Sequence, residues 1–348
     1  MMKLLHSADW HLDAPMVGKD EAQAAFLRAQ LRKVPEKVAK LCNQENCSLL
    51  LLSGDLFDGE YTKESYRAVY DALKELDVPV FIAPGNHDHL GLGPWRTEQF
   101  PDNVHIFTSP RLTAVQLDDL TVYGAGYSSM DCPALLEGFC APEDNAICVL
   151  HGDPTLATSP NCPVTAAQVA GSNLRYLALG HIHKAGQFTA GSTLCGWPGC
   201  PMGRGFDELG PKGAYIVTLG DTTGIQFVTL DTPRFFDLEA PVNGDPAAAI
   251  AALLTAAQTQ DYYRITLTGE SNPPDIQALT AAFPHVPHLT LRDRTTAPVD
   301  LWENAGEDSF QGTLFALLKE QTAEHPETAA LAAKICRQIL NNQEVSLP

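Results

Sequence analysis

The chain contains no long apolar run and no cysteine pair of the CxxC type. Among its 348 residues no segment approaches the roughly 18–20 apolar residues of a membrane span, which argues against a membrane protein. The polar residues His6, Asp9 and His11 come before any apolar segment that would indicate a signal peptide. We therefore expect a cytoplasmic protein.

Disulfides are not expected either. The nine cysteines are odd in number and lack the spacing of a zinc ribbon, and some lie in apolar runs such as residues 146–150. This pattern favours reduced thiols over a disulfide framework or a zinc ribbon.

Positive charge is scarce, with 23 Lys and Arg against 42 Asp and Glu and a net charge of −19. Residues 1–230 carry a net charge of −10 and residues 231–348 a net charge of −9, so the shorter region is nearly as acidic. Bound metal ions would offset some of the first charge but none of the second. Since nucleic-acid-binding domains usually present a basic face, we do not expect residues 231–348 to grip DNA by themselves.

The first part of the chain alternates strands and helices. Strands are expected at 2–8, 48–52 and 78–83, each followed by a polar motif, with helices at 21–42 and 63–76. This order indicates βαβ units and a buried sheet, with site residues after the carboxyl ends of the strands. Further strands are expected at 104–107, 112–117, 120–124, 146–150, 176–179, 214–219 and 224–230. Together they predict two sheets packed face to face with helices outside.

Pro233 marks a domain boundary. Beyond it we expect a small α/β module and then two amphipathic helices, at 309–321 and 326–341. The predicted domains are therefore residues 1–232, 233–300 and 301–348.

Five short motifs combine Asp, His and Asn at strand ends. They are Asp9-Trp10-His11, Gly54-Asp55-Leu56-Phe57-Asp58, Gly85-Asn86-His87-Asp88, His151-Gly152 and Gly180-His181-Ile182-His183. Two divalent ions need such oxygen and nitrogen ligands, and two ions roughly 3.5–4 Å apart can activate water and clamp a phosphoryl group. The seven predicted metal ligands are Asp9, His11, Asp55, Asn86, His151, His181 and His183.

Each predicted ligand has a stated reason. Asp55, a carboxylate with two oxygens, is the predicted bridge between the ions. Asp9 and His11 would lie on one side of an extended segment, and His181 and His183 share that spacing. Asn86 would add a neutral oxygen. A lone histidine would more often be a hydrogen-bonded core residue, but seven such positions in this order indicate a site.

His87 and Asp58 are the predicted catalytic residues. The His87 imidazole would protonate the leaving alkoxide, and Asp58 would orient that imidazole through a hydrogen bond. The alternative is that His87 only supports Asn86. Asp13 and Asp88 would either accept hydrogen bonds from ligating histidines or be solvated.

At these motifs the chain resembles the calcineurin-like metallophosphoesterases, and within them the SbcD and YhaO branch. Segments 9–13, 54–58 and 85–88 suit that branch, whereas the protein Ser/Thr phosphatases have Arg-Gly after the second Asp and Glu after the His. Segment 198–213 looks like a YhaO-type loop, although Cys200 and Met202 replace its usual polar residues. Arg204 is the candidate phosphate contact there.

The resemblance implies a four-layer α/β/β/α sandwich with a small C-terminal α/β capping domain. It also implies two metal ions, with Mn²⁺ favoured over Mg²⁺, Fe²⁺ or Zn²⁺, and exonuclease and endonuclease activity on DNA during repair. Its implied partners are a second copy of the chain and an SMC-like ATPase of SbcC/YhaN type. The helices of 301–348 would dock that ATPase or pack on their own domain.

Three functions remain open. The first is a DNA nuclease subunit that hydrolyses phosphodiesters with metal-activated water. The second is a phosphodiesterase or phosphatase for a small phosphoester, which the acidic charge favours. The third is a non-catalytic scaffold, which would not need His87.

Overall fold

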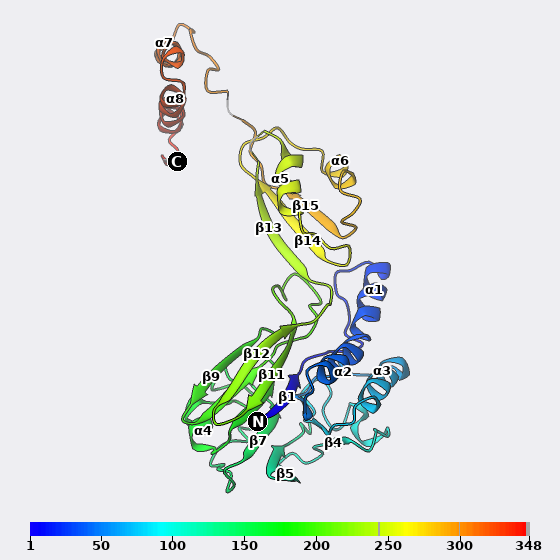
Figure 1. Ribbon diagram of the computed structural model, residues 1–348. Helices are drawn as coiled ribbons and strands as arrows, with labels where there is room; N and C mark the ends of the chain where they lie inside the picture. Colours follow the sequence, from blue (N-terminus) through cyan, green and yellow to red (C-terminus); the bar gives the residue numbers. More distant parts are fainter. Residues whose placement is uncertain (243, 299, 346–348) are drawn as a thin grey trace. The chain divides into compact units, whose positions relative to one another are not determined.

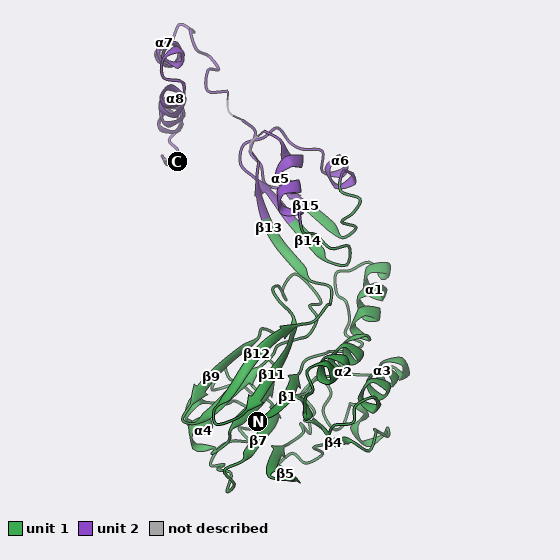
Figure 2. Ribbon diagram, in the orientation of Figure 1, with its two compact units in different colours: residues 1–238, 256–264, 283–290 green, residues 239–255, 265–282, 291–348 purple. Residues whose placement is uncertain are grey.

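The computed structural model describes residues 1–242, 244–298 and 300–345, which form two compact units (Figure 2). Unit 1 comprises residues 1–238, 256–264 and 283–290, and unit 2 comprises the described residues of 239–255, 265–282 and 291–348. The predicted boundaries at 232 and 300 stay a prediction. Residues 243 and 299 of the predicted capping domain and residues 346–348 of the predicted helical end lie outside the described residues.

The first sheet has six strands in the order β12–β11–β1–β2–β3–β4 (Figure 1). The last four in this order are parallel, with Leu4 opposite Leu49 and Leu50 opposite Val80, while β11 and β12 are antiparallel additions. The strands are β1 (Met2–Ser7), β2 (Leu49–Leu52), β3 (Val80–Ile82), β4 (Val104–Ile106), β11 (Gly213–Leu219) and β12 (Thr223–Thr229). Parallel pairing brings the carboxyl ends of β1, β2 and β3 to one edge.

The second sheet also has six strands, in the order β5–β6–β7–β8–β10–β9, and its four inner strands are parallel. Its strands are β5 (Thr113–Leu117), β6 (Leu120–Gly124), β7 (Ala146–His151), β8 (Tyr176–Gly180), β9 (Gly186–Ala190) and β10 (Thr193–Trp197). The sequence did not predict β9, β10 or helix α4 (Ala166–Gly171). The strands β7 and β8 end in candidate ligands.

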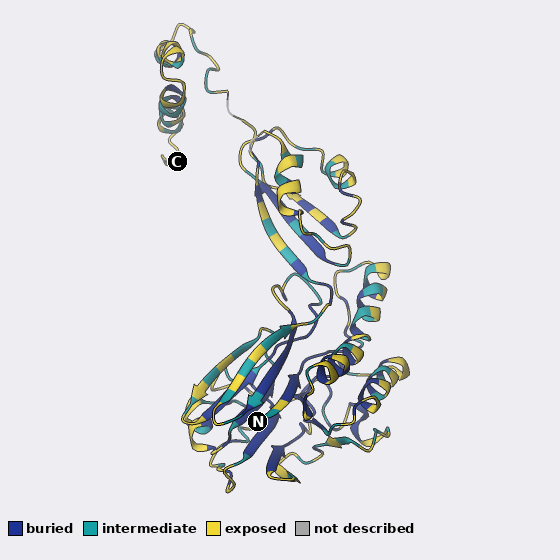
Figure 3. Ribbon diagram, viewed as in Figure 1, coloured by how far each residue is buried: buried dark blue, intermediate teal, exposed yellow. Residues whose placement is uncertain are grey.

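One hydrophobic core lies between the two sheets. It combines Leu4, Leu51 and Phe81 of the first sheet with Val149 and Tyr176 of the second. These side chains are buried, as the dark blue strands of Figure 3 show. The sheets therefore pack face to face, and the predicted mixed α/β fold with two sheets is confirmed.

Alternating strand residues build a second core on the other face of the first sheet. Leu5, Leu50 and Leu52 pack there with Leu27 and Val38 of the helices. These helices are α1 (Glu21–Leu31), α2 (Val34–Gln44) and α3 (Lys63–Lys74). On the outer face of the second sheet, α4 contributes to a third core.

The single helix predicted over 21–42 is wrong. The structure has α1 and α2, with Arg32 and Lys33 between them. Pro35 lies in the first turn of α2, where its missing N–H is tolerated. In the interior of one long helix its ring would clash with the carbonyl of Leu31, so the helix restarts.

The remaining elements follow β12. The strands β13 (Phe235–Pro241), β14 (Tyr262–Thr268) and β15 (Leu289–Asp293) form a sheet in the order β13–β14–β15, and the boundary between the units runs through them. The helices are α5 (Pro246–Leu253), α6 (Ile276–Ala281), α7 (Phe310–Glu320) and α8 (Pro326–Leu340), with short 3-10 turns at Pro94–Arg96 and Gln321–Ala323. None of the helices in the described residues is long and apolar enough to cross a membrane.

Candidate metal centre

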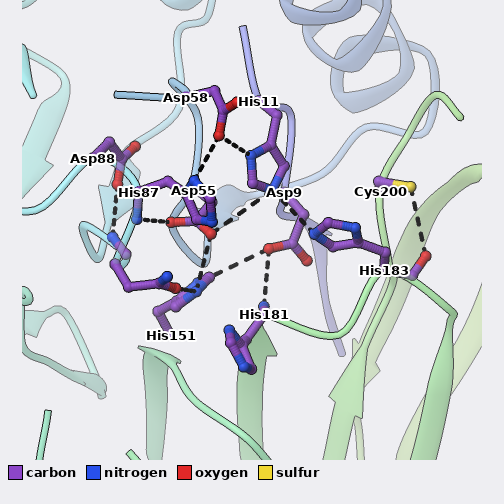
Figure 4. Close-up of polar contacts among 12 residues, drawn as sticks. Asp9, His11, Asp55, Asp58, His87, Asp88, His151, His181, His183 and Cys200 are labelled. Carbon is purple, nitrogen blue, oxygen red and sulfur yellow. Dashed lines mark hydrogen bonds and ion pairs between the residues drawn. The ribbon is translucent and has the colours of Figure 1, made fainter. Parts of the chain in front are cut away.

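The candidate ligands gather where five parallel strands end (Figure 4). Asp9 follows β1, Asp55 follows β2, and Asn86 follows β3 of the first sheet. His151 ends β7, and His181 follows β8 of the second sheet. The face-to-face packing of the sheets thus brings residues that lie up to 172 positions apart in the chain into one cluster.

Left-handed backbone aims these side chains. The φ angles are 55° at Asp9, 49° at His11 and 51° at Asp55. The expectation that Asp9 and His11 project from an extended segment is therefore wrong. Instead, the segment pairs with the turn after β2, since Asp9 N donates to Gly54 O (3.0 Å) and His11 N donates to Asp55 O (2.9 Å). These bonds hold a conformation that is unfavourable for residues other than glycine.

Asp9, His11 and His183 form the first group of ligand atoms, which lie within 4.8 Å of one another. The Nε2 atoms of His11 and His183 are 3.0 Å apart and face each other. Both imidazoles thus direct a ring nitrogen at the same small region.

Asp9, Asp55 and His151 form the second group. Asp55 Oδ2 lies 3.2 Å from His151 Nε2 and 3.7 Å from His11 Nε2. Asn86 Oδ1 lies 2.8 Å from the same His151 nitrogen. The Asp55 carboxylate therefore lies between the two groups, where a bridging ligand would be needed.

Each of the three converging histidines has an acceptor at its other ring nitrogen. Nδ1 lies 3.0 Å from Asp58 Oδ1 in His11, 2.9 Å from Ser53 O in His151 and 2.7 Å from Glu208 Oε1 in His183. Such acceptors place the proton on Nδ1 and leave the Nε2 lone pair for a metal. Three lone pairs therefore point into one cluster.

The residues fit divalent ions in their chemistry. Asp9 Oδ2 is buried and has no hydrogen-bond partner among the described residues, so a cation would satisfy it. Gly85 leaves the room that the cluster needs, because a Cβ there would overlap Asp55 Oδ1. Carboxylate, amide and imidazole donors together suit Mn²⁺, Fe²⁺ and Zn²⁺.

The pKa values reflect crowding of charge in a buried site. Burial opposes protonation of His151, but Asp55 and Asp9 raise its pKa to about 9. Burial would raise the pKa of Asp55, but His151 and His11 hold it well below its usual range. The pKa of His11 is lowered, mainly by burial. The cluster therefore favours an ionised Asp55 that is compensated by positive charge.

His87 lies at the open side of the cluster. Its Nδ1 lies 2.6 Å from Asp58 Oδ1, and its side chain is 45% exposed. The hydrogen bond to Asp58 is the main cause that raises the pKa of His87, which keeps its imidazole more often protonated. Its backbone N donates to Asp55 Oδ1 at 2.9 Å. A substrate could therefore meet a protonated imidazole beside the candidate ligands.

His181 and Arg204 make different contacts from those of the cluster. Within the described residues, His181 belongs to none of the groups of His, Cys, Asp and Glu ligand atoms. Its backbone N donates to Asp9 Oδ1 (2.9 Å), and its ring stands edge-on to His151 with centroids 5.2 Å apart. Arg204 donates from Nη2 to Glu208 Oε1 at 2.6 Å and approaches His183 Nδ1 at 3.1 Å.

Asp13 and Asp88 do neither of the two things predicted for them. The buried Asp88 accepts backbone N–H groups from Leu56 (2.7 Å), Phe57 (3.2 Å) and Gly85 (2.7 Å), so it ties the Asp55 turn to the Asn86 turn. Burial and Asp55 raise the pKa of Asp88 to about 7. Asp13 accepts from Thr62 and Ser65 at the start of α3. Both predictions were wrong because the backbone, not a histidine, needed an acceptor.

Glu208 is the site residue that the sequence did not reveal. It is buried, and its carboxylate binds both His183 and Arg204, which hold its pKa below the usual range against the effect of burial. The loop of 198–213 drew attention to Arg204, but no spacing in it pairs Glu208 with His183. Only the folded loop brings them together.

Comparison with known proteins assigns a family. A family model described as calcineurin-like phosphoesterase matches residues 2–185, and the chain belongs to this family. The family membership supports hydrolysis of phosphoesters with divalent metals. The chain is 33% identical over 250 residues to the uncharacterized metallophosphoesterase YhaO of Bacillus subtilis (strain 168), which covers 63% of this chain and 58% of that protein. The chain thus spans less than two thirds of that relative's length.

The resemblance to the SbcD and YhaO branch is confirmed by a second relative. The chain is 22% identical over 328 residues to the SbcD component of the nuclease SbcCD of Staphylococcus epidermidis, which covers 82% of this chain and 84% of that protein. Among solved structures, a dimetal phosphatase from Danio rerio is 12% identical, covers 65% of this chain and 95% of that chain, and has a TM-score of 0.39.

Proposed function

We propose that the protein is a two-metal phosphodiester hydrolase of the SbcD and YhaO type, a nuclease subunit that acts on DNA. The observation that carries the proposal is the convergence of three acceptor-backed histidines on the Asp55 carboxylate. Asp9, His11, Asp55 and His183 would hold one ion. Asp55, Asn86, His151 and His181 would hold the other, and for this the His181 ring must turn from its place beside His151.

The ions would supply positive charge at the phosphoryl oxygens and an activated water. The protein's own residues then divide the remaining work. His87 would give its proton to the leaving oxygen, since the imidazole is half-exposed beside Asp55. Asp58 would orient His87 and His11 at once, because its Oδ1 contacts Nδ1 of both rings. Arg204 would approach a non-bridging phosphate oxygen from the His183 side.

The nuclease assignment rests on the named relatives and extends to partners. We infer Mn²⁺ as the favoured metal, a homodimer, and an SMC-like ATPase of SbcC/YhaN type that docks on the helices of 301–348. Residues 233–300 would cap the catalytic domain of 1–232, and the protein would act in the cytoplasm.

The acidic composition supports a second candidate, hydrolysis of a small phosphoester. A chain with a net charge of −19 repels a polyanion wherever its field is not locally inverted. A scaffold whose metal site serves assembly is the third candidate, and the His87–Asp58 contact counts against it.

One set of assays separates these functions. The purified chain is incubated with Mn²⁺ and either end-labelled DNA, duplex and single-stranded, or bis(p-nitrophenyl) phosphate. DNA degradation that needs both metal and His87, tested with His87→Asn, supports the nuclease. Intact DNA with turnover of the small diester supports the second candidate, and metal binding without hydrolysis supports the scaffold.

His87→Asn also tests the acid itself. We expect turnover of DNA to fall by roughly 10²–10⁴-fold, the usual contribution of general acid–base catalysis. Turnover of bis(p-nitrophenyl) phosphate should fall far less, because p-nitrophenolate leaves without a proton. Equal losses on both substrates with Mn²⁺ still bound would remove the acid role from His87.

A further inference from the structure

Next to the candidate metal centre, unit 1 contains a pocket of about 590 Å³. The loop of residues 15–19 and the loop of residues 204–208 form its walls, and Arg264 of β14 also lines it. Arg204 and Glu208 belong both to this pocket and to the surroundings of His183. The pocket therefore adjoins the first group of ligand atoms.

Two cations of the pocket converge on one aromatic ring. Lys19 Nζ lies 5.1 Å from the centroid of the Phe206 ring, and Arg264 Cζ lies 4.3 Å from it. Lys19 Nζ is also 4.7 Å from the Phe235 centroid and 5.3 Å from the Tyr262 centroid. Ring quadrupoles thus hold the ammonium in place without neutralising its charge.

The cations differ in how they are compensated. Arg204 is paired with Glu208, and Arg264 donates from Nε to Asp237 Oδ1 at 2.9 Å. Lys19 Nζ makes no hydrogen bond or salt bridge to another of the described residues. Burial lowers the pKa of Lys19, Asp207 opposes this, and Arg264 adds to it. The proximity of Arg264 and Lys19 thus carries an unfavourable repulsion that an anion would relieve.

This local arrangement contrasts with the charge of the whole chain. With a net charge of −19, the protein has few cations to place, yet three of them line one pocket beside the metal centre. Low-dielectric walls focus the field of such a group, so it attracts anions even though the rest of the surface is acidic. The three ammonium protons of Lys19 remain as donors for oxygen acceptors.

We propose that Lys19 and Arg264 form a second anion-binding subsite, which takes the phosphate next to the scissile one in a nucleic-acid strand. The inference rests on the proposed function, because it assumes that the scissile phosphate lies at the metal centre. Arg204 stands between the two phosphates, on the wall that the pocket and the centre share. An isolated small phosphoester has no second phosphate for this subsite, so the subsite favours a strand.

The test compares substrates that differ by one charge. They are the thymidine dinucleotide with one phosphodiester, the trinucleotide with two, and trinucleotides in which either linkage is a neutral methylphosphonate. With Mn²⁺ we expect kcat/KM to be roughly tenfold higher for the trinucleotide than for the dinucleotide, the gain of about one hydrogen bond to a charged group. In the wild-type protein, one of the two methylphosphonates should abolish this gain while it preserves length and shape.

Variants assign the gain to residues. Lys19→Gln and Arg264→Gln should each reduce the trinucleotide-to-dinucleotide ratio toward one, and Lys19→Arg, which keeps the charge, should restore it. Lys74→Gln removes one positive charge from the exposed surface of α3 and is the matched control, with the wild-type ratio expected. The ratio is insensitive to a general loss of active protein, and the methylphosphonate comparison needs no variant at all.

The outcomes are distinct. A wild-type ratio in both Lys19→Gln and Arg264→Gln would overturn the subsite, as would methylphosphonates that keep the full gain. If no oligonucleotide is hydrolysed, the proposed function fails. Anisotropy of a fluorescein-labelled trinucleotide in EDTA then still tests the subsite, which predicts roughly tenfold weaker binding for Lys19→Gln and for the neutral linkage; equal binding would overturn it.

Discussion

Asp58 Oδ1 lies 2.6 Å from Nδ1 of His87, and the same oxygen lies 3.0 Å from Nδ1 of His11. One carboxylate therefore serves a candidate metal ligand and the candidate acid. Its side chain is only 12% exposed, so water replaces it poorly. This sharing makes Asp58 a positioning residue for two functions at once.

Asp58→Asn should reduce kcat/KM by about 10- to 100-fold, the usual effect of removing the hydrogen-bond acceptor of a ligating histidine. The amide keeps the shape of the side chain but loses the negative charge that favours both protonated rings. Steady-state rates at increasing Mn²⁺ measure the effect. Asp71→Asn, on the exposed face of α3, is the control. Rates for Asp58→Asn within twofold of wild type would mean that Asp58 positions neither ring.

Gly85→Ala should disable the centre. The added Cβ would overlap Asp55 Oδ1 and lie 2.7 Å from Asp55 N, so the bridging carboxylate must move. We expect Mn²⁺ binding, measured by calorimetry, to weaken by more than tenfold, since small displacements of ligands are poorly tolerated. Gly171→Ala in α4 meets nothing within 4 Å and should bind Mn²⁺ as wild type does. If Gly85→Ala binds normally, Asp55 is not held as the structure has it.

Glu208→Gln should weaken Mn²⁺ binding by about 10- to 100-fold. Glu208 fixes the Nδ1 proton of His183 and also anchors Arg204, and the neutral amide does both less well. Calorimetry at constant pH measures the affinity. Glu137→Gln, an exposed change of the same type, is the control. An unchanged affinity would show that His183 needs no acceptor there.

His6 predicts a dependence of stability on pH. It is buried between Tyr176 Oη (2.7 Å) and Ser53 Oγ (2.8 Å), and burial lowers its pKa from 6.5 to about 3. Between these values the unfolded chain binds a proton that the folded chain does not, so stability falls as the pH drops below 6.5. From pH 6.5 to pH 5 this amounts to about 2 kcal/mol of unfolding free energy.

Urea unfolding of the metal-free protein at pH 7.5 and pH 5, followed by intrinsic fluorescence, measures this loss. His6→Gln keeps a polar group but cannot take up the proton, so its unfolding free energy should fall less with pH than that of the wild type. Losses of equal size in both proteins would place the acid sensitivity in other groups.

Strand positions were predictable because β1, β2, β7 and β8 are runs of buried apolar residues bounded by polar motifs. The strand β9 escaped prediction, since only alternate residues of it are partly covered, and β10 contains Gly196. Such strands take their conformation from neighbours that lie close only in the folded protein.

The predicted ligands illustrate the same limit. The motifs identified Asp9, His11 and Asp55 as members of one cluster, and the structure brings them together. The sequence could not reveal the acceptors behind the histidines, because Ser53 O is a backbone group and Glu208 lies 25 residues from His183. Nor could it reveal that the His181 ring stacks edge-on with His151.

The left-handed turns at Asp9, His11 and Asp55 have a consequence for anyone who engineers this protein. Each places a residue with a side chain where glycine would be more comfortable, at a penalty of roughly 1 kcal/mol. Selection for thermal resilience alone would enrich glycine at these positions and erase the metal centre without disturbing the sheets. A stabilised variant must therefore be obtained by a screen that demands ion binding in the same round.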